Sequence, residues 1–216
     1  MGEAILYGAA YSVYVRAVRL ALAEKGVPYR LVEVDVFAPG GPPAEHRARH
    51  PFGRIPAFEH DGFALYESGA VSRYVDEAFA GPRLQPAGAK PRARMNQVLG
   101  ILDSYAYPTL VWDIFVERVR APRNGRTADE ARIAAALPRA ETCLAALAAI
   151  KGEQPFLAGA ALSLADLHAA PIVAYFTMAP EGRAMLDRHR TLARWWAEIA
   201  ERPSMAATRS PFEAAD

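Results

Sequence analysis

Apolar residues in the first part of the chain recur with the spacing of short strands and of one amphipathic helix. Residues 5–7, Ile-Leu-Tyr, form a short apolar run that is typical of a strand. Residues 13–25 then place valine and leucine at helical spacing, and Gly26 with a proline two residues later is a standard helix stop. Residues 29–36 alternate between apolar and polar side chains, which predicts a second strand.

A second group of elements follows a loop rich in proline and glycine. Residues 44–50 are polar and predict a short, irregular helix. Two apolar runs, residues 55–59 and 63–65, frame Asp61-Gly62, a turn that is typical of a β-hairpin. A helix is expected from about Glu67 to Phe79. This order of strands and helices predicts a small mixed sheet with helices on both faces.

The composition changes at residues 81–91, which contain three prolines and two glycines and predict a linker. Beyond it, alanine-rich stretches with helical periodicity dominate. Pro108 lies inside the first of these helices and predicts a kink. Ser163 and Asp166 form a variant of the capping box. The predicted fold is an α/β N-terminal domain over residues 1–80 and an all-α domain over residues 92–216, with helices near residues 92–119, 127–150, 164–176 and 192–202.

Composition and charge exclude several classes of partner. The chain has 216 residues, 52% of them hydrophobic, which is enough for one or two buried cores. With 25 Lys and Arg against 24 Asp and Glu, no single-sign field favours nucleic acid or an anionic membrane. We find neither a secretory signal pattern nor an uninterrupted apolar stretch of roughly 18 residues. Cys143 is alone, and no Cys or His cluster has zinc spacing. We expect a cytoplasmic protein without a metal.

Residues 52–74 combine features that suit a small anionic peptide. Arg54-Ile55-Pro56 offers an extended backbone edge that ends at a proline. Glu67-Ser68 opens a helix, where free N–H groups and the positive end of the helix dipole favour a carboxylate. A backbone edge beside a carboxylate site predicts a short anionic peptide as ligand.

These motifs, in their order along the whole chain, resemble the cytosolic glutathione S-transferases. The resemblance implies a thioredoxin-like N-terminal domain, an all-helical C-terminal domain and glutathione as co-substrate. Serine followed by arginine four residues later is most similar to the phi-type and related bacterial branches. The matching residues are Leu6-Tyr7-Gly8, Ser12, Arg16, His50-Pro51-Phe52-Gly53-Arg54-Ile55-Pro56, Glu67-Ser68 and Ser163-Leu164-Ala165-Asp166.

The chain departs from the family pattern at the end of the site that would hold the glycine of glutathione. Many phi-like members carry a His-Lys pair where this chain has Gly41-Pro42, and His50 stands where asparagine is usual. The resemblance therefore implies that the glycyl carboxylate is held differently or less tightly.

The resemblance implies that Ser12 activates the sulfur of glutathione. A free thiol has a pKa of about 8.5, so an enzyme must lower it to obtain the nucleophilic thiolate. A hydroxyl donor near a helix N-terminus favours the charged form. A plain N-cap serine is the alternative for Ser12, and Tyr11 and Tyr7 are rival hydroxyls, with Tyr7 better explained as a sheet residue. Arg16 is either a ligand contact or a structural arginine.

The implied glutathione contacts follow the peptide from its middle to its γ-glutamyl end. Ile55 pairs with the cysteinyl backbone by strand addition, and Pro56 is expected to be cis. Glu67 faces the γ-glutamyl amino group and Ser68 its carboxylate. Ordinary strand entry and a solvated helix start are the alternatives for these segments. The implied set is His50, Arg54, Ile55, Pro56, Glu67 and Ser68.

An apolar electrophile is expected to bind between the two halves, although an aromatic stripe on a helix is more often core. Cys143 is expected to be an inert core thiol, His168 a satisfied core histidine and Trp195-Trp196 an anchor for the last helix. The candidate lining residues are Tyr14, Phe37, Tyr105, Tyr107, Trp112 and Phe115.

The leading functional hypothesis is a glutathione transferase that adds the thiolate to an apolar electrophile. The same thiolate could serve a dehalogenase, peroxidase or isomerase, although the isomerase branch usually shows a paired serine that Tyr11-Ser12 does not match. A protein of this fold that binds ligands or partners without catalysis is the alternative from a different class. The resemblance also implies a homodimer.

Overall fold

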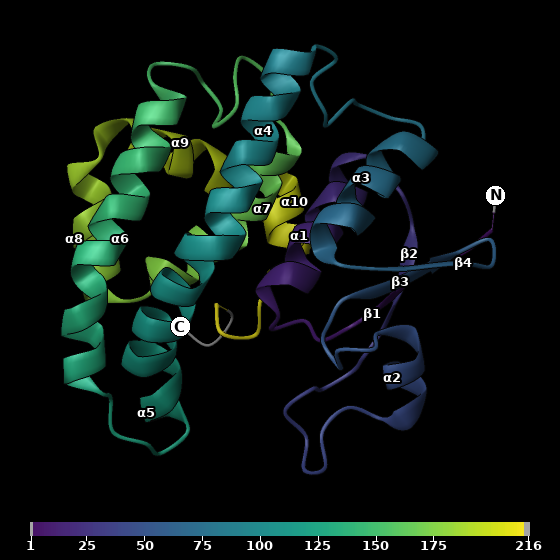
Figure 1. Ribbon diagram of the computed structural model, residues 1–216, viewed down its shortest axis with the longest axis horizontal. Coiled ribbons are helices and arrows are strands. Elements are labelled where there is room, and N and C mark those ends of the chain that lie inside the picture. The colour runs from purple at the N-terminus through teal and green to yellow at the C-terminus, as the bar shows by residue number, and fades with distance from the viewer. Residues whose placement is uncertain (1, 214–216) are drawn as a thin grey trace. The chain divides into compact units, whose positions relative to one another are not determined.

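The chain forms two compact units in the computed structural model, which describes residues 2–213. Unit 1 comprises the residues up to 84 together with those from 202 onward, and unit 2 is Gln85–Glu201. Figure 1 shows the sheet with its helices in unit 1 and the helical array of unit 2.

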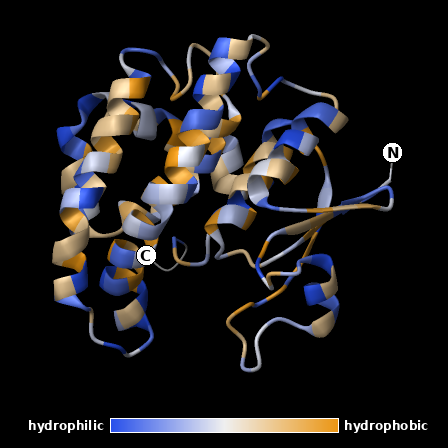
Figure 2. Cartoon of the chain, in the orientation of Figure 1, coloured by the Kyte–Doolittle hydropathy of each residue, from blue (hydrophilic) through white to orange (hydrophobic). Residues whose placement is uncertain are grey.

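Unit 1 is built on one four-stranded sheet with the order β2-β1-β3-β4 (Figure 1). β1 (Ala4–Tyr7) is parallel to β2 (Tyr29–Val32) and antiparallel to β3 (Ala57–His60). β3 turns into β4 (Phe63–Tyr66) through Asp61-Gly62, where both residues have positive φ. The predicted hairpin and small mixed sheet are confirmed, and Figure 2 shows the polar tip of this hairpin.

The second strand is shorter than predicted. β2 ends at Val32, whereas the alternation of the sequence continues to Val36. The register explains the difference, because Val32 lies opposite Tyr7, the last residue of β1. Past this pair, Gly8 N–H donates to the Val32 carbonyl at 2.9 Å and Val34 N–H reaches the Gly8 carbonyl at 3.4 Å.

Three helices of unit 1 lie on the two faces of its sheet (Figure 1). α1 packs against α3, and the buried Lys25 at the end of α1 pairs with Asp76 of α3 at 3.2 Å. α2 contacts β4. The bounds are α1 (Val13–Glu24), α2 (Ala44–Arg49) and α3 (Ser68–Ala78).

The end of the chain returns to unit 1, where α10 (Pro203–Ala207) packs on α1. Arg202 donates two hydrogen bonds to Glu24 at 2.8 and 2.7 Å. Arg16 is buried, donates to the carbonyl of Met205 at 3.2 Å and pairs with Glu213. The sequence prediction assigned residues from 202 onward to the helical domain. The contacts that bring them back to unit 1 join residues far apart in the chain and leave no local signature in the sequence. Of the two roles expected for Arg16, the structure shows the structural one.

The regular elements of unit 2 are helices, apart from an isolated β-bridge between Phe156 and Gly159, and α7 is its buried centre. Every residue of α7 is buried, and the helix packs against α4, η1 and α9. The predicted capping box is confirmed, because the Asp166 carboxylate accepts from the Ser163 N–H at 2.9 Å. The bounds are α4 (Ala89–Ile101), η1 (Leu102–Arg120), α5 (Ala121–Arg123), α6 (Glu130–Lys151), α7 (Leu164–Phe176), α8 (Pro180–Arg188) and α9 (Arg190–Ala200).

The helix expected near residues 92–119 is α4 followed without a break by η1, which is a π-helix. Pro108 lies within η1. A proline clashes with the carbonyl four residues before it in an α-helix, and the wider π turn relieves that clash. α8 was not predicted, because its sequence is mostly polar and offers few apolar positions.

α6 is long and apolar enough by composition to cross a membrane, and it is the single such helix among the residues that the structure describes. It packs along η1 and α9 in unit 2, and core helices pass the same test. Its composition is therefore weak evidence for a membrane span.

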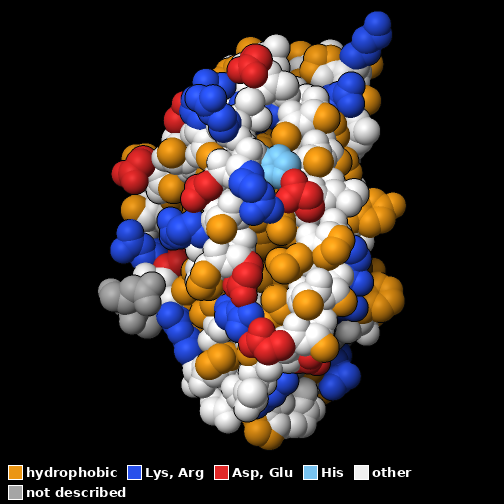
Figure 3. Space-filling model, turned by 90° about the vertical axis from the view of Figure 1, so that its left-hand side faces the viewer, with side chains coloured by type: hydrophobic (Ala, Val, Ile, Leu, Met, Phe, Trp, Pro, Cys, Tyr) orange, Lys and Arg blue, Asp and Glu red, His pale blue; other side chains and the backbone are white. Residues whose placement is uncertain are grey.

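On the side of the molecule shown in Figure 3, basic and acidic side chains are interspersed.

Candidate functional site

Ile55 presents an unpaired stretch of backbone next to the sheet. Its side chain is 9% exposed, and the Ile55–Pro56 peptide bond is cis, as predicted. Among the described residues, neither the N–H nor the C=O of Ile55 has a hydrogen-bond partner. Backbone groups of buried residues are nearly always paired, so this edge is suited to a partner from outside the chain.

The start of α3 offers a second set of unpaired N–H groups. Glu67 is the N-cap with a φ of 70°, and no side chain caps this end of the helix. The first backbone hydrogen bond of α3 runs from Val71 N–H to the Glu67 carbonyl. The N–H groups of the intervening residues are therefore free for a ligand within the described part of the chain, and this arrangement favours a carboxylate. Ser68 is nearly buried and Glu67 is exposed.

Ser12 caps the N-terminus of α1 and is half-buried. Its Oγ accepts a hydrogen bond from Val15 N–H at 3.3 Å. No carbonyl or carboxylate of the described residues takes the proton of this hydroxyl. Ser12 can therefore donate to an anion held at the start of α1, where the helix dipole also favours negative charge.

The two rival hydroxyls each donate to a carboxylate. Tyr11 Oη donates to Asp35 Oδ1 at 2.7 Å, and the Tyr11 ring lies beside Phe37. Tyr7 Oη donates across the sheet to Glu59 at 2.8 Å. Burial, followed by this hydrogen bond, raises the pKa of Tyr7. Tyr7 is a sheet residue with a paired polar tip, as the sequence suggested.

His50 is almost completely buried, with 2% of its surface exposed. Its ring lies 4.7 Å from that of Tyr66, measured between centroids. Burial lowers the pKa of His50, and the positive charge of Arg54 acts in the same direction, while Glu67 opposes it. A neutral His50 is thus part of the support of the site, with little surface left for a direct ligand contact.

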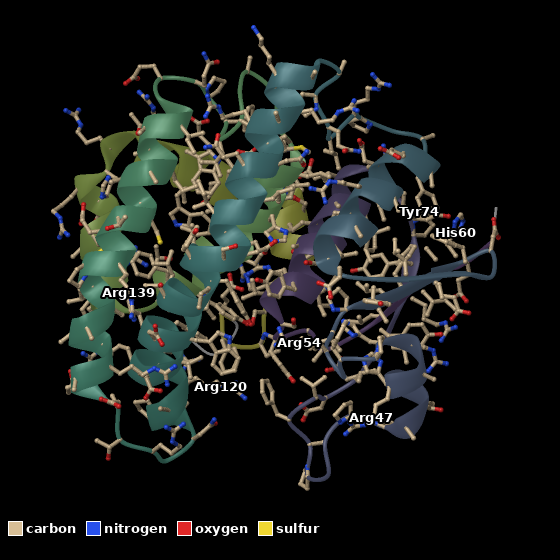
Figure 4. The ribbon with its side chains drawn as sticks, viewed as in Figure 1. Arg47, Arg54, His60, Tyr74, Arg120 and Arg139 are labelled. Carbon is tan, nitrogen blue, oxygen red and sulfur yellow. The ribbon has the colours of Figure 1, made fainter. Side chains whose placement is uncertain are left out.

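Arginine side chains gather around the segment that precedes Ile55. The side chain of Arg54 is exposed, and its guanidinium has no ionic or hydrogen-bonding partner among the described residues. Arg47 of α2 donates to the Pro42 carbonyl at 3.3 Å, and Arg49 lies over the Tyr7 ring at 4.3 Å. Figure 4 shows Arg47 and Arg54 in this part of unit 1.

The aromatic candidates for an electrophile pocket differ widely in exposure. Phe37 is 49% exposed and Tyr105 is 64% exposed, whereas Tyr14, Tyr107 and Trp112 are half-buried. Phe115 is 1% exposed and stacks on Tyr175 with 4.2 Å between ring centroids. Phe115 therefore packs in the core of unit 2.

Unit 2 has a groove of about 560 Å³ along η1 and α6. Asp113 and Arg139, which pair at 2.8 Å, contribute polar groups to it. Burial raises the pKa of Cys143, which agrees with the inert thiol expected from the sequence. The apolar and weakly polar lining includes Ile101, Tyr105, Pro108, Thr109, Cys143 and Ala146.

Sequence reasoning missed His46, whose ring nitrogen contacts the carbonyl of Arg54. A polar six-residue helix gave no sign that this side chain is buried. Among residues 2–213, no group of three or more His, Cys, Asp or Glu side chains is arranged to hold a metal ion.

Models of known domains match both halves of the chain. The N-terminal domain of glutathione S-transferases matches residues 6–83, and the C-terminal domain matches residues 103–203. Glutathione S-transferase 4 of Zea mays is 32% identical over 199 residues, covering 92% of this chain and 88% of that protein. Glutathione S-transferase F10 of Arabidopsis thaliana is 31% identical over 200 residues, covering 91% and 92%.

Solved structures with the same fold lead to the same family. A structure of glutathione S-transferase III in its apo form has a TM-score of 0.85 at 27% identity and covers 97% of each chain. Glutathione S-transferase I from maize, in complex with an atrazine glutathione conjugate, has a TM-score of 0.86 at 25% identity, covering 99% of this chain and 100% of that one.

A thioredoxin-like domain joined to an all-helical domain is the architecture of the glutathione S-transferase class. The chain belongs to the glutathione S-transferase family. Its activity is that of a glutathione transferase.

Proposed function

We propose that unit 1 binds glutathione by its cysteinyl backbone and its γ-glutamyl end. The observation that carries this proposal is the unpaired N–H and C=O of the nearly buried Ile55, beside the cis proline Pro56. The cysteinyl residue pairs with Ile55, and the γ-glutamyl carboxylate accepts from the free N–H groups and hydroxyl at Ser68. Glu67 is exposed and faces the γ-glutamyl amino group.

Ser12 is our candidate for activating the thiol. Its hydroxyl donates to the sulfur and, with the dipole of α1, stabilises the thiolate over the thiol. The thiolate attacks an electrophilic carbon, a C–S bond forms, and the leaving group departs with its bonding electrons while the thiol proton passes to solvent. Tyr11 is the less suitable donor, because Asp35 already accepts its proton. This assignment supports the serine-type branch of the family.

Replacing Ser12 by alanine tests the assignment, with Tyr11→Phe as the matched loss of a neighbouring hydroxyl. We expect Ser12→Ala to lower turnover of a chlorinated nitroaromatic at least tenfold, which is typical for the loss of one charge-stabilising donor. Retention on immobilised glutathione should persist, because the Ile55 edge is intact. Unchanged turnover in Ser12→Ala with a loss in Tyr11→Phe would transfer the role to Tyr11.

The same experiment separates the enzyme from the alternative functions. Wild-type protein that is retained on glutathione but turns over no chlorinated, peroxide or double-bond substrate would be a binding protein. Turnover of a peroxide or a haloalkane in preference to the nitroaromatic would favour a peroxidase or dehalogenase. For the electrophile itself we infer an apolar compound, and the exposed ring of Phe37, which lies next to the Tyr11 ring, is the first candidate for contact.

Arg54 is our candidate for holding the glycyl carboxylate, because its exposed guanidinium has no carboxylate partner among the described residues. Arg54→Gln should weaken binding of glutathione several-fold, since a charge-assisted hydrogen bond is lost. Binding of the glycinamide analogue, which lacks this carboxylate, should change little. Calorimetric titration of both ligands checks the coupling. Arg49→Gln is the control, because it removes a nearby arginine that contacts the Tyr7 ring and the Glu45 carbonyl.

We infer that the protein acts as a homodimer in the cytoplasm. Phe52 is 70% exposed and Phe63 is 50% exposed, and large exposed apolar side chains are typical of interaction surfaces. The reduction potential of the cytosol keeps glutathione in its reduced form, the form that carries a free thiol.

A further inference from the structure

His46 is a buried histidine whose side chain makes one hydrogen bond among the described residues, and that bond reaches the edge that we assign to glutathione. It lies in α2 and is 1% exposed. Its Nε2 is 2.7 Å from the carbonyl oxygen of Arg54. A carbonyl only accepts, so the ring carries a proton on Nε2 and donates it. The other ring nitrogen, Nδ1, is buried without a partner among the described residues.

The carbonyl that His46 holds belongs to the same peptide unit as the N–H of Ile55. A peptide unit is planar, and in the trans form its C=O and N–H point in opposite directions. Holding the Arg54 carbonyl therefore fixes the direction of the Ile55 N–H. The next residue, Pro56, has no N–H, so Ile55 supplies the one backbone donor of this two-residue step.

We propose that His46 is a positioning residue, which aims the Ile55 N–H at the backbone of the bound peptide. The inference rests on the proposed binding of glutathione at Ile55. Without the His46 bond, the Arg54–Ile55 peptide unit can rotate, and the ligand must then restrain it on binding. A restrained donor binds more tightly than a mobile one, because less conformational freedom is lost.

A purely structural role, in which His46 only attaches α2, predicts a different result. His60 provides the comparison, because it is a second buried histidine of unit 1, with one ring nitrogen hydrogen-bonded and the other, Nε2, making no hydrogen bond but lying 3.6 Å from Asp61 Oδ2. Its Nδ1 lies 2.9 Å from Tyr74 Oη, and the two side chains lie next to each other in Figure 4. His60 is at the hairpin end of β3, five residues beyond Ile55 in sequence.

The test compares His46→Gln with His46→Met, two side chains of similar length of which only glutamine has an N–H donor. We expect the dissociation constant of glutathione to rise about fivefold in His46→Met and to stay within twofold of wild type in His46→Gln, as befits one neutral hydrogen bond. The turnover number at saturating glutathione should be preserved. His60→Met should lose stability while its affinity for glutathione is unchanged. His46→Asn, a polar side chain too short to reach Arg54, repeats the loss of the bond if His46→Met does not fold.

Hydrogen exchange at the Ile55 amide gives a readout that a structural role would not move. Glutathione should slow exchange of this amide strongly in wild type and in His46→Gln, and only weakly in His46→Met or His46→Asn. Equal protection of the Ile55 amide and equal affinity for glutathione in wild type and all the His46 variants would overturn this inference but leave the proposed function standing. Wild-type protein that fails to bind glutathione would overturn the proposed function and the inference together.

Discussion

At the scale of single residues, the buried His50 makes the stability of the folded state depend on pH. Burial holds the pKa of His50 below its ordinary value of 6.5, so the folded state favours the neutral ring. The unfolded chain takes up this proton first as the pH falls below 6.5. Stability therefore falls with pH in that window, because the unfolded state binds more protons there. Above the window both states are neutral at this position, and the contribution is constant.

Replacing His50 by asparagine should remove this dependence. Urea unfolding at pH 7.5 and pH 5.5 should show a smaller loss of stability in His50→Asn than in wild type. An equal loss in both proteins would mean that other groups carry the acid sensitivity.

At the scale of elements, the start of α7 depends on one buried carboxylate. Asp166 accepts from Leu157 N–H at 2.8 Å and from Ser163 N–H, Ser163 Oγ and Trp195 Nε1 at 2.9 Å each. The carboxylate thus joins the preceding loop, the helix cap and α9 in the core of unit 2. The bond from Trp195 gives a physical basis for the anchoring role expected of Trp195-Trp196.

Asp166→Ala should lower the free energy of unfolding by about 3 kcal/mol or more, because several buried donors lose their acceptor. Asp129→Ala is the matched control, since Asp129 caps α6 through Arg132 N–H at 2.9 Å but is not buried. That change should cost about 1 kcal/mol, the ordinary value of an N-cap. Equal losses in a chemical denaturation series would contradict the role of Asp166 as a buried junction.

Elements whose signals are local were predictable, and those set by distant contacts were not. Residues within four positions in the sequence are enough to predict the helix caps at Ser12 and Ser163 and the turn at Asp61-Gly62. The burial of His46 depends on how α2 packs, and the return of residues from 202 onward depends on Glu24 and Arg16, far away in the chain. The extended edge at Arg54-Ile55-Pro56 was expected from the sequence itself, but its pairing with the cysteinyl backbone was implied only by the family resemblance, since an unpaired N–H has no sequence signature.

At the scale of the whole molecule, the proposed homodimer predicts a mass near twice 23.5 kDa in light scattering. Isologous dimers bury apolar side chains that are exposed in the single chain, and Phe52 and Phe63 are candidates for such burial. Phe52→Ser should shift the mass toward the monomer, while Phe37→Ser, another exposed phenylalanine, should not. A single-chain mass for the wild type at micromolar concentration would contradict the dimer.

The unpaired backbone at Ile55 is also built in a way that limits the addition of strands from other protein chains. Exposed strand edges invite other chains to add strands, and proteins protect them by keeping them short or by placing proline in them. Here the unpaired Ile55 is followed at once by Pro56, which has no N–H. A tripeptide can pair with Ile55, but a strand of another protein finds no donor at Pro56 to continue the ladder in that direction. The same feature that admits a small ligand therefore keeps this site from seeding aggregation.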